Sequence, residues 1–210
     1  MRKALEIGGL VAAVVLVAFG IGAIAMGVNG RETVRDSLKL EQIVGTPDMT
    51  AQGIAAEAKA AGLTGVKLPT ANIAGKQIVT GLRARDFASY IRIHALEASG
   101  GLTYSQMPRY ATADGKGTND PKQALTANGK PVDNAARSLW VTETALATAL
   151  NASYMAEQVA LFGIVVGVAL LLTGIGHGVL AVGGTLRDAD PALRLFGREP
   201  TAVAPALPTQ

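Results

Sequence analysis

Two histidines are the side chains of this sequence best suited to binding a metal or moving a proton. His177 lies in a long apolar segment, where an ionisable residue often serves as a haem ligand or a proton relay. The alternative is a neutral histidine bonded to a backbone carbonyl, and we favour it because no second histidine accompanies His177 there. His94 lies on the apolar stripe of an expected helix, and zinc sites need three or four ligands. We therefore interpret His94 as a core histidine and His177 as a speculative functional residue.

Serine and acidic residues form weaker patterns. Catalysis by a serine, histidine and acid would draw on residues in the region of His94, which are Asp86, Ser89, Ser99 and Ser105. The sequence has no nucleophile elbow of the G-x-S-x-G type to support it. Residues 114–120 resemble a calcium loop, but the spacing of their acidic ligands fails. The sequence therefore predicts a non-enzymatic protein with no catalytic residue, no metal and no cofactor.

Two apolar segments, residues 7–28 and 159–182, organise the whole chain. Neither contains a charged residue, and each exceeds the roughly 20 apolar residues that cross a bilayer core as a helix. They separate a short N-terminus (1–6), a polar middle (29–158) and a tail (183–210), whose Pro- and Ala-rich end indicates partial disorder. The sequence thus predicts a two-span protein of the cytoplasmic membrane, embedded in the lipid bilayer.

The basic residues near the two apolar segments predict the orientation. Lys and Arg beside short loops stay in the cytoplasm, whereas a long middle is translocated largely regardless of its charge. Both termini are therefore expected to be cytoplasmic and residues 29–158 extracytoplasmic, given the flanking residues Arg2, Lys3, Arg187, Arg194 and Arg198. A cleaved signal peptide is the alternative, with 23–25 as its A-x-A site. Its apolar core is usually only 7–15 residues long, which favours an uncleaved anchor.

Composition limits the remaining possibilities. The chain has no cysteine, so a middle segment outside the cell would hold together without disulfides. The formal charge of +3 is spread along the sequence, without a dense run of Lys or Arg. Nucleic acid is therefore not an expected partner.

The middle segment has the punctuation of helices. We expect helices at 31–44, at 51–61 behind an N-cap at Thr50, and at 82–99. The third should bury a stripe at 3.6-residue spacing: Phe87, Tyr90, Ile91, His94 and Ala98. Residues 103–131 are turn-rich, and a helix beginning after Asp133 or Asn134 should run without interruption to residue 182. The predicted fold is all-α, with two transmembrane helices extended as stalks into a small extracytoplasmic helical bundle.

Small residues recur on one face of each apolar segment. In the first segment, a heptad-like seam that includes Leu16 contains Gly9, Ala13, Gly20, Ala23 and Gly27. In the second, two G-x-x-x-G pairs share a face, formed by Gly163, Gly167, Gly174 and Gly178. Small residues allow helix backbones to approach in lipid, where there is no hydrophobic driving force for association. We expect the two spans to pair within one chain, with homodimerisation through the same faces as the alternative.

Several short runs resemble a family of uncharacterised actinobacterial membrane proteins. They are residues 45–50 (GTPDMT), 54–63, 92–98 (RIHALEA), 141–146 (VTETAL) and 164–176. The resemblance covers most of residues 34–182 and implies two spans and a helical extracytoplasmic domain, without an implied activity.

These observations favour an accessory or scaffold subunit that presents a helical surface to a larger complex. Its partner would be a membrane protein or further copies of the same chain. An extracytoplasmic ligand sensor that acts through a separate effector is the first alternative, because paired stalks suit such a device. An oligomeric channel or transporter component is the second, although no intramembrane acid or base other than His177 is present.

Overall fold

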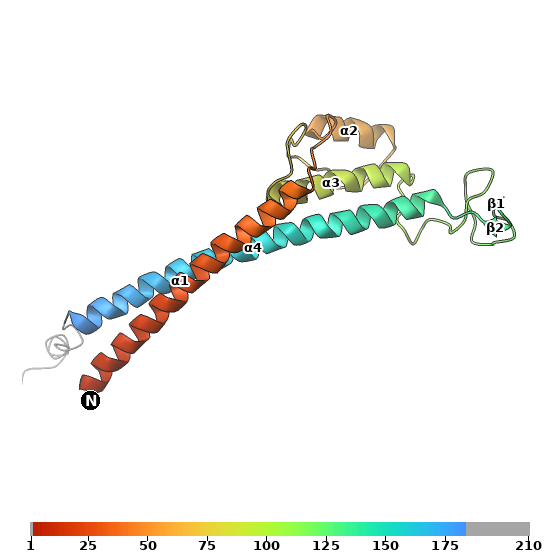
Figure 1. Cartoon of the computed structure of the whole chain (residues 1–210). Helices are drawn as coiled ribbons and strands as arrows, with labels where there is room; N and C mark the ends of the chain where they lie inside the picture. The colour runs from red at the N-terminus through yellow and green to blue at the C-terminus, as the bar shows by residue number, and fades with distance from the viewer. Residues whose placement is uncertain (1, 184–210) are drawn as a thin grey trace, which may run out of the picture. The chain divides into compact units, whose positions relative to one another are not determined.

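The computed structural model describes residues 2–183 and is mostly helical. Its elements are α1 (Arg2–Leu40), α2 (Ala51–Ala60), α3 (Gly81–Ala98), β1 (Thr126–Ala127), β2 (Lys130–Pro131) and α4 (Ala135–Val182) (Figure 1). The prediction of a partly disordered cytoplasmic tail concerns residues that lie, apart from Gly183, outside this range. Contacts divide the chain into an apolar unit (Met1–Met26 and Gly163–Gln210) and a central unit (Gly27–Phe162).

Two helices, α1 and α4, are long and apolar enough to cross a membrane. Only 11% of the most apolar stretch of each is buried, whereas the core helix of a water-soluble protein would be mostly covered. Large apolar side chains are exposed along both, including Phe19 (69%) and Leu172 (63%). The hydrocarbon of a bilayer would cover such a surface.

Within the apolar unit, the two helices touch through backbone at their glycines. A Cβ added to Gly20 would lie 2.8 Å from the carbonyl oxygen of Gly167, and one added to Gly167 would lie 2.7 Å from that of Gly20. A Cβ added to Gly174 would likewise lie 2.9 Å from the backbone nitrogen of Val17. Ala13, which also lies beside Gly174, is only 6% exposed. Any larger side chain at these glycines would separate the two backbones.

The helices of the central unit begin where the sequence predicts. The hydroxyl of Thr50 accepts a hydrogen bond from the backbone of Gly53, so Thr50 is the N-cap of α2. Gly62, with φ +66°, follows the end of α2 in the left-handed conformation that glycine adopts readily. The side-chain oxygen of Asn134 accepts from the backbone of Ala136 at the start of α4. The predicted uninterrupted helix to residue 182 is confirmed.

The predicted helix at 31–44 ends early, at Leu40. Val44 pairs instead with Gln77, and the backbone of Gly45 donates to the carbonyl of Lys76. A Cβ on Gly45 would lie 2.1 Å from the carbonyl oxygen of Ile73. The chain therefore leaves the helix because residues 44–45 pack against the loop between α2 and α3.

The core of the central unit combines side chains from all four helices. Leu38 of α1, Ile54 of α2, Tyr90 of α3 and Leu150 of α4 belong to one buried cluster. A second cluster joins Ala95 and Trp140 to Met107, so Trp140 packs against α3.

The predicted stripe of α3 is only partly correct. Phe87 and Tyr90 are buried, but Ala98 is exposed and Ile93 is buried in its place. The reason is that α3 has neighbours on two sides: it contacts α2, and it packs against α4 through Ala95 and Trp140. A helix covered on two sides buries more than a single stripe.

The segment before α4 contains the only hairpin in the described part of the chain. Strands β1 and β2 are joined by Asn128 and Gly129, both with positive φ, which is the turn that an Asn-Gly pair favours. Residues 122–126, within the segment expected to be turn-rich, form a turn and the start of β1.

Candidate functional site

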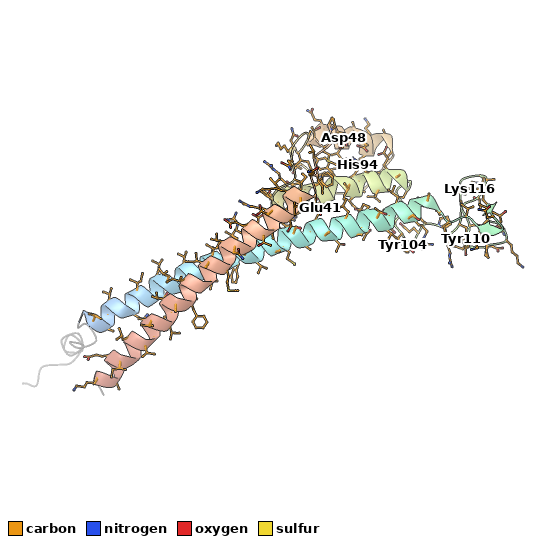
Figure 2. All side chains as sticks on the ribbon, viewed as in Figure 1. Glu41, Asp48, His94, Tyr104, Tyr110 and Lys116 are labelled. Atoms are coloured by element: carbon orange, nitrogen blue, oxygen red, sulfur yellow. The ribbon has the colours of Figure 1, made fainter. Side chains whose placement is uncertain are left out.

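Three side chains from separate parts of the central unit converge on one point. His94 Nε2 lies 2.9 Å from Asp48 Oδ2 and 3.4 Å from Glu57 Oε2. One donor atom from each of the three residues falls within 4.8 Å of the other two. We call this set the His94 cluster; Figure 2 labels Asp48 and His94 where α2 and α3 lie together.

The loop before α2 holds Asp48 in place. The backbone of Thr50 donates to the carbonyl of Asp48, and that of Met49 donates to the carbonyl of Thr46. A Cβ on Gly53 would lie only 2.3 Å from the carbonyl oxygen of Asp48. Glycine at this position therefore lets the loop fold back onto the first turn of α2.

Glu57 and His94 are positioned by the packing of α2 on α3. Ile54 and Ala58, which flank Glu57 along α2, are both buried in the core, as is Ile93 next to His94. The side chains of Glu57 and His94 remain half-buried, at 24% and 31% exposure. The cluster thus lies at the edge of the core, within reach of solvent.

The pKa values of the two carboxyl groups in the cluster are shifted in opposite directions. A hydrogen bond with the Thr46 side chain lowers the pKa of Asp48 against a smaller opposing effect of burial, with a further contribution from His94. A hydrogen bond with Glu97 raises the pKa of Glu57, as do burial and the charge of Glu97. Two carboxyl groups therefore face the imidazole, and a third, that of Glu97, opposes the ionisation of Glu57.

The Nε2 atom of His94 is itself buried, although its ring is partly exposed. Its polar neighbours are the two carboxylate oxygens, 2.9 Å away on Asp48 and 3.4 Å away on Glu57. Oxygen and nitrogen donors facing one another in this way can hold a cation, or a proton on the imidazole.

We interpreted His94 as a core histidine; in the structure its side chain is 31% exposed and contacts the carboxylates of Asp48 and Glu57 at the edge of the core. The carboxylates that face His94 come from the loop before α2 and from α2, so they lie outside the helix that contains it. Docking the expected helix at 51–61 against the expected helix at 82–99 would have placed Glu57 near His94.

The serines considered for catalysis bond elsewhere. Ser89 Oγ donates to the carbonyl of Arg85, and Ser99 Oγ lies at bonding distance from the carbonyls of Leu96 and Leu102. Ser105 Oγ lies 3.5 Å from the hydroxyl of Thr103. The structure brings none of these hydroxyls to His94 within the described residues.

The remaining candidates from the sequence have local partners. His177 Nδ1 lies 2.9 Å from the carbonyl oxygen of Thr173, the kind of backbone contact that we had favoured for it. In the calcium-like loop, Asp114 accepts from the backbone of Lys116, and its pKa is lowered by a hydrogen bond from Thr112. That carboxylate therefore stabilises a turn.

A buried carboxylate that sequence reasoning missed ties three helices together. Glu157 of α4 accepts hydrogen bonds from Arg35 Nε of α1 at 3.0 Å and from the backbone of Gly81, the first residue of α3, at 2.6 Å. Arg31 lies 3.5 Å away. Burial raises the pKa of Glu157, but the bonds from Gly81 and Arg35 and the two arginine charges outweigh it and lower that pKa overall.

A second buried carboxylate, Glu143, also lies on α4. It pairs with Arg92 at 3.2 Å, and the guanidinium of Arg92 stacks 4.0 Å above the ring of Trp140. Glu143, Leu150 and Glu157 are seven residues apart and share one helix face. This seven-residue spacing could have indicated from the sequence that Glu143 and Glu157 face the core, because they lie on the same side of the helix as Leu150.

Comparisons with known proteins identify no relative. No protein-family model matches the chain, no curated protein matches it, and no solved structure matches it.

Proposed function

We propose that this protein is a two-span membrane subunit that presents its central unit to a larger membrane-protein partner outside the cytoplasm. The observation that carries the proposal is the exposed apolar surface of two helices that touch backbone to backbone at glycines. Such a pair needs lipid around it and gives the chain a fixed anchor. Its role is that of an accessory or scaffold, without a reaction of its own.

The expected topology places both termini in the cytoplasm and residues 29–158 on the other side. The basic residues that flank the spans support this orientation. Because the chain contains no cysteine, a single introduced thiol reports one position only.

A membrane-impermeant maleimide should label Lys116→Cys in intact cells and leave Lys3→Cys unlabelled until the membrane is opened. Both residues are exposed in the structure, so a difference in labelling reflects the side of the membrane. The readout is a mass shift of the labelled full-length chain. Labelling of Lys3→Cys from outside, or protection of Lys116→Cys, would reverse the topology.

An apolar groove on α4 supports the partner. The groove has a volume of about 550 Å³ and is lined by Tyr104, Trp140, Val141 and Ala145, together with Thr144 and Thr148 of α4. Val141 is 53% exposed and Leu139, nearby on the same helix, is 48% exposed. An aromatic and aliphatic surface of this kind is typical of the centre of protein interfaces.

Val141→Glu should release the partner from gently solubilised membranes, while Thr142→Glu should retain it. Thr142 neighbours Val141 on α4 and is exposed, but it does not line the groove. A charge buried in an apolar contact without a partner costs several kcal/mol, which is at least about a hundredfold in affinity. Native mass measurement of the detergent-solubilised complex gives the stoichiometry, and a wild-type chain recovered only as a monomer would refute the proposal.

A further inference from the structure

We propose that Asp48, Glu57 and His94 bind a divalent transition-metal ion, with Zn²⁺ as the reference ion. The site lies wholly within the central unit and does not depend on a partner or on membrane orientation. An imidazole nitrogen beside two carboxylates is a donor set for Zn²⁺, Mn²⁺, Fe²⁺ or Co²⁺. Mg²⁺ and Ca²⁺ prefer oxygen ligands throughout.

The spacing of the donors fits a single ion. Zinc binds nitrogen and oxygen donors at about 2.0–2.2 Å, so two ligands on one tetrahedral ion are about 3.4 Å apart. His94 Nε2 is 3.4 Å from Glu57 Oε2 and 2.9 Å from Asp48 Oδ2. The donor oxygens of Asp48 and Glu57 lie within 4.8 Å of each other, so modest side-chain adjustment would bring all three donors onto one ion.

The donors are also preorganised. Asp48 is fixed by the tight loop that Gly53 accommodates, and it is bonded to Thr46 as ligating carboxylates commonly are to groups behind them. The buried Nε2 atom of His94 faces both carboxylates, at 2.9 Å from Asp48 Oδ2 and 3.4 Å from Glu57 Oε2. Partial exposure of the three side chains leaves space for a water as a fourth ligand.

A protonated His94 paired with the two carboxylates is the competing explanation for the same distances. This explanation requires no metal, and a different positively charged side chain at position 94 would form the same ion pairs. The two explanations differ in whether the nitrogen acts as a donor to a metal or carries a proton.

The test is calorimetric titration of Zn²⁺ into the full-length chain in detergent, purified without a polyhistidine tag and treated with a chelator. We expect one equivalent to bind, and Asp48→Asn, Glu57→Gln and His94→Ala each to weaken binding by more than the 10–100-fold typical of losing a supporting residue. His177→Ala is the matched control and should leave the affinity unchanged, since it removes the only other histidine. Millimolar Mg²⁺ or Ca²⁺ should not displace the ion.

Two further measurements keep the result decisive. Fluorescence of Trp140, the only tryptophan, reports whether each variant retains a folded central unit. The visible spectrum of bound Co²⁺ should change in Asp48→Asn and remain unchanged in His177→Ala. The proposal is overturned if folded wild-type protein binds no Zn²⁺, if binding survives in His94→Ala, or if it is lost in His177→Ala. If Zn²⁺ leaves the thermal stability of the wild type unchanged, and His94→Lys is as stable as the wild type, the cluster is an ion pair and not a metal site.

Discussion

Glu157→Ala should lower the free energy of unfolding of the central unit by about 3–5 kcal/mol, the range for removing one partner of a buried ion pair. The side chain is only 7% exposed, and it accepts from Arg35 and from the backbone of Gly81. Its loss leaves the N–H at the start of α3 without an acceptor and removes a negative charge from the positive end of that helix.

Denaturant unfolding of the full-length chain in detergent measures this effect. Trp140 is buried in the central unit and gives the signal. Glu32→Ala is the matched control, since Glu32 is an exposed carboxylate on α1 close to Arg31 and Arg35. That substitution should change stability by no more than about 0.5 kcal/mol. Equal effects of the two substitutions would show that the network contributes no specific stability.

The stabilisation by Glu157 should also depend on pH in one direction. Its pKa is lower in the folded chain than its ordinary value of 4.5, so its contribution is complete above that value. The contribution is lost as the pH falls through the lowered pKa. The stability difference between wild type and Glu157→Gln should therefore be constant near neutrality and shrink in acid. A difference that grows on acidification would contradict the assignment.

Gly167→Ile should separate the two apolar helices. A Cβ at Gly167 meets the carbonyl oxygen of Gly20 at 2.7 Å and the backbone nitrogen of Ile24 at 2.9 Å. Neither backbone atom can move without shifting a whole helix. The cost should therefore reach or exceed the upper end of the roughly 1–3 kcal/mol of ordinary overpacking.

A disulfide between Ala13→Cys and Gly178→Cys measures the separation. A Cβ at Gly178 would lie 3.6 Å from that of Ala13, which matches disulfide geometry. Oxidation of membranes should form this bond efficiently, and Gly167→Ile should abolish it. Gly176→Ile is the control, because a side chain at Gly176 meets nothing within 4 Å.

The position of the cross-linked product on a denaturing gel separates the two pairings that the sequence left open. A bond within one chain keeps the mobility of a monomer, whereas pairing of two chains through the same faces gives a covalent dimer. Efficient cross-linking that persists in Gly167→Ile would refute close packing at this glycine.

Helix positions could be predicted because their signals are local. Thr50, Gly62 and Asn134 act through hydrogen bonds and backbone angles within a few residues, and each marks an observed helix boundary. The two apolar helices were equally predictable, since length and uncharged composition suffice. The end of α1 was not predictable from the sequence. The helix ends at Leu40 because Gly45 contacts the loop between α2 and α3.

The candidate site was not predictable by the same means. His94 and Glu57 are brought together by the docking of α2 on α3, and no spacing within either helix reveals it. Glu157 illustrates a related failure, since its partners Arg35 and Gly81 lie far away in the sequence. A single sequence specifies the face of a helix more clearly than the neighbour that will cover it.

The core cluster that unites Leu38, Ile54, Tyr90 and Leu150 has a consequence for biosynthesis. The ribosome makes these residues in order, at about 5–20 residues per second, so the apolar faces of α2 and α3 wait several seconds for α4 to cover them. These apolar faces stay uncovered during that interval, and transiently exposed apolar surface promotes aggregation. Aggregation of a chain truncated before α4 would be the visible cost of this late closure.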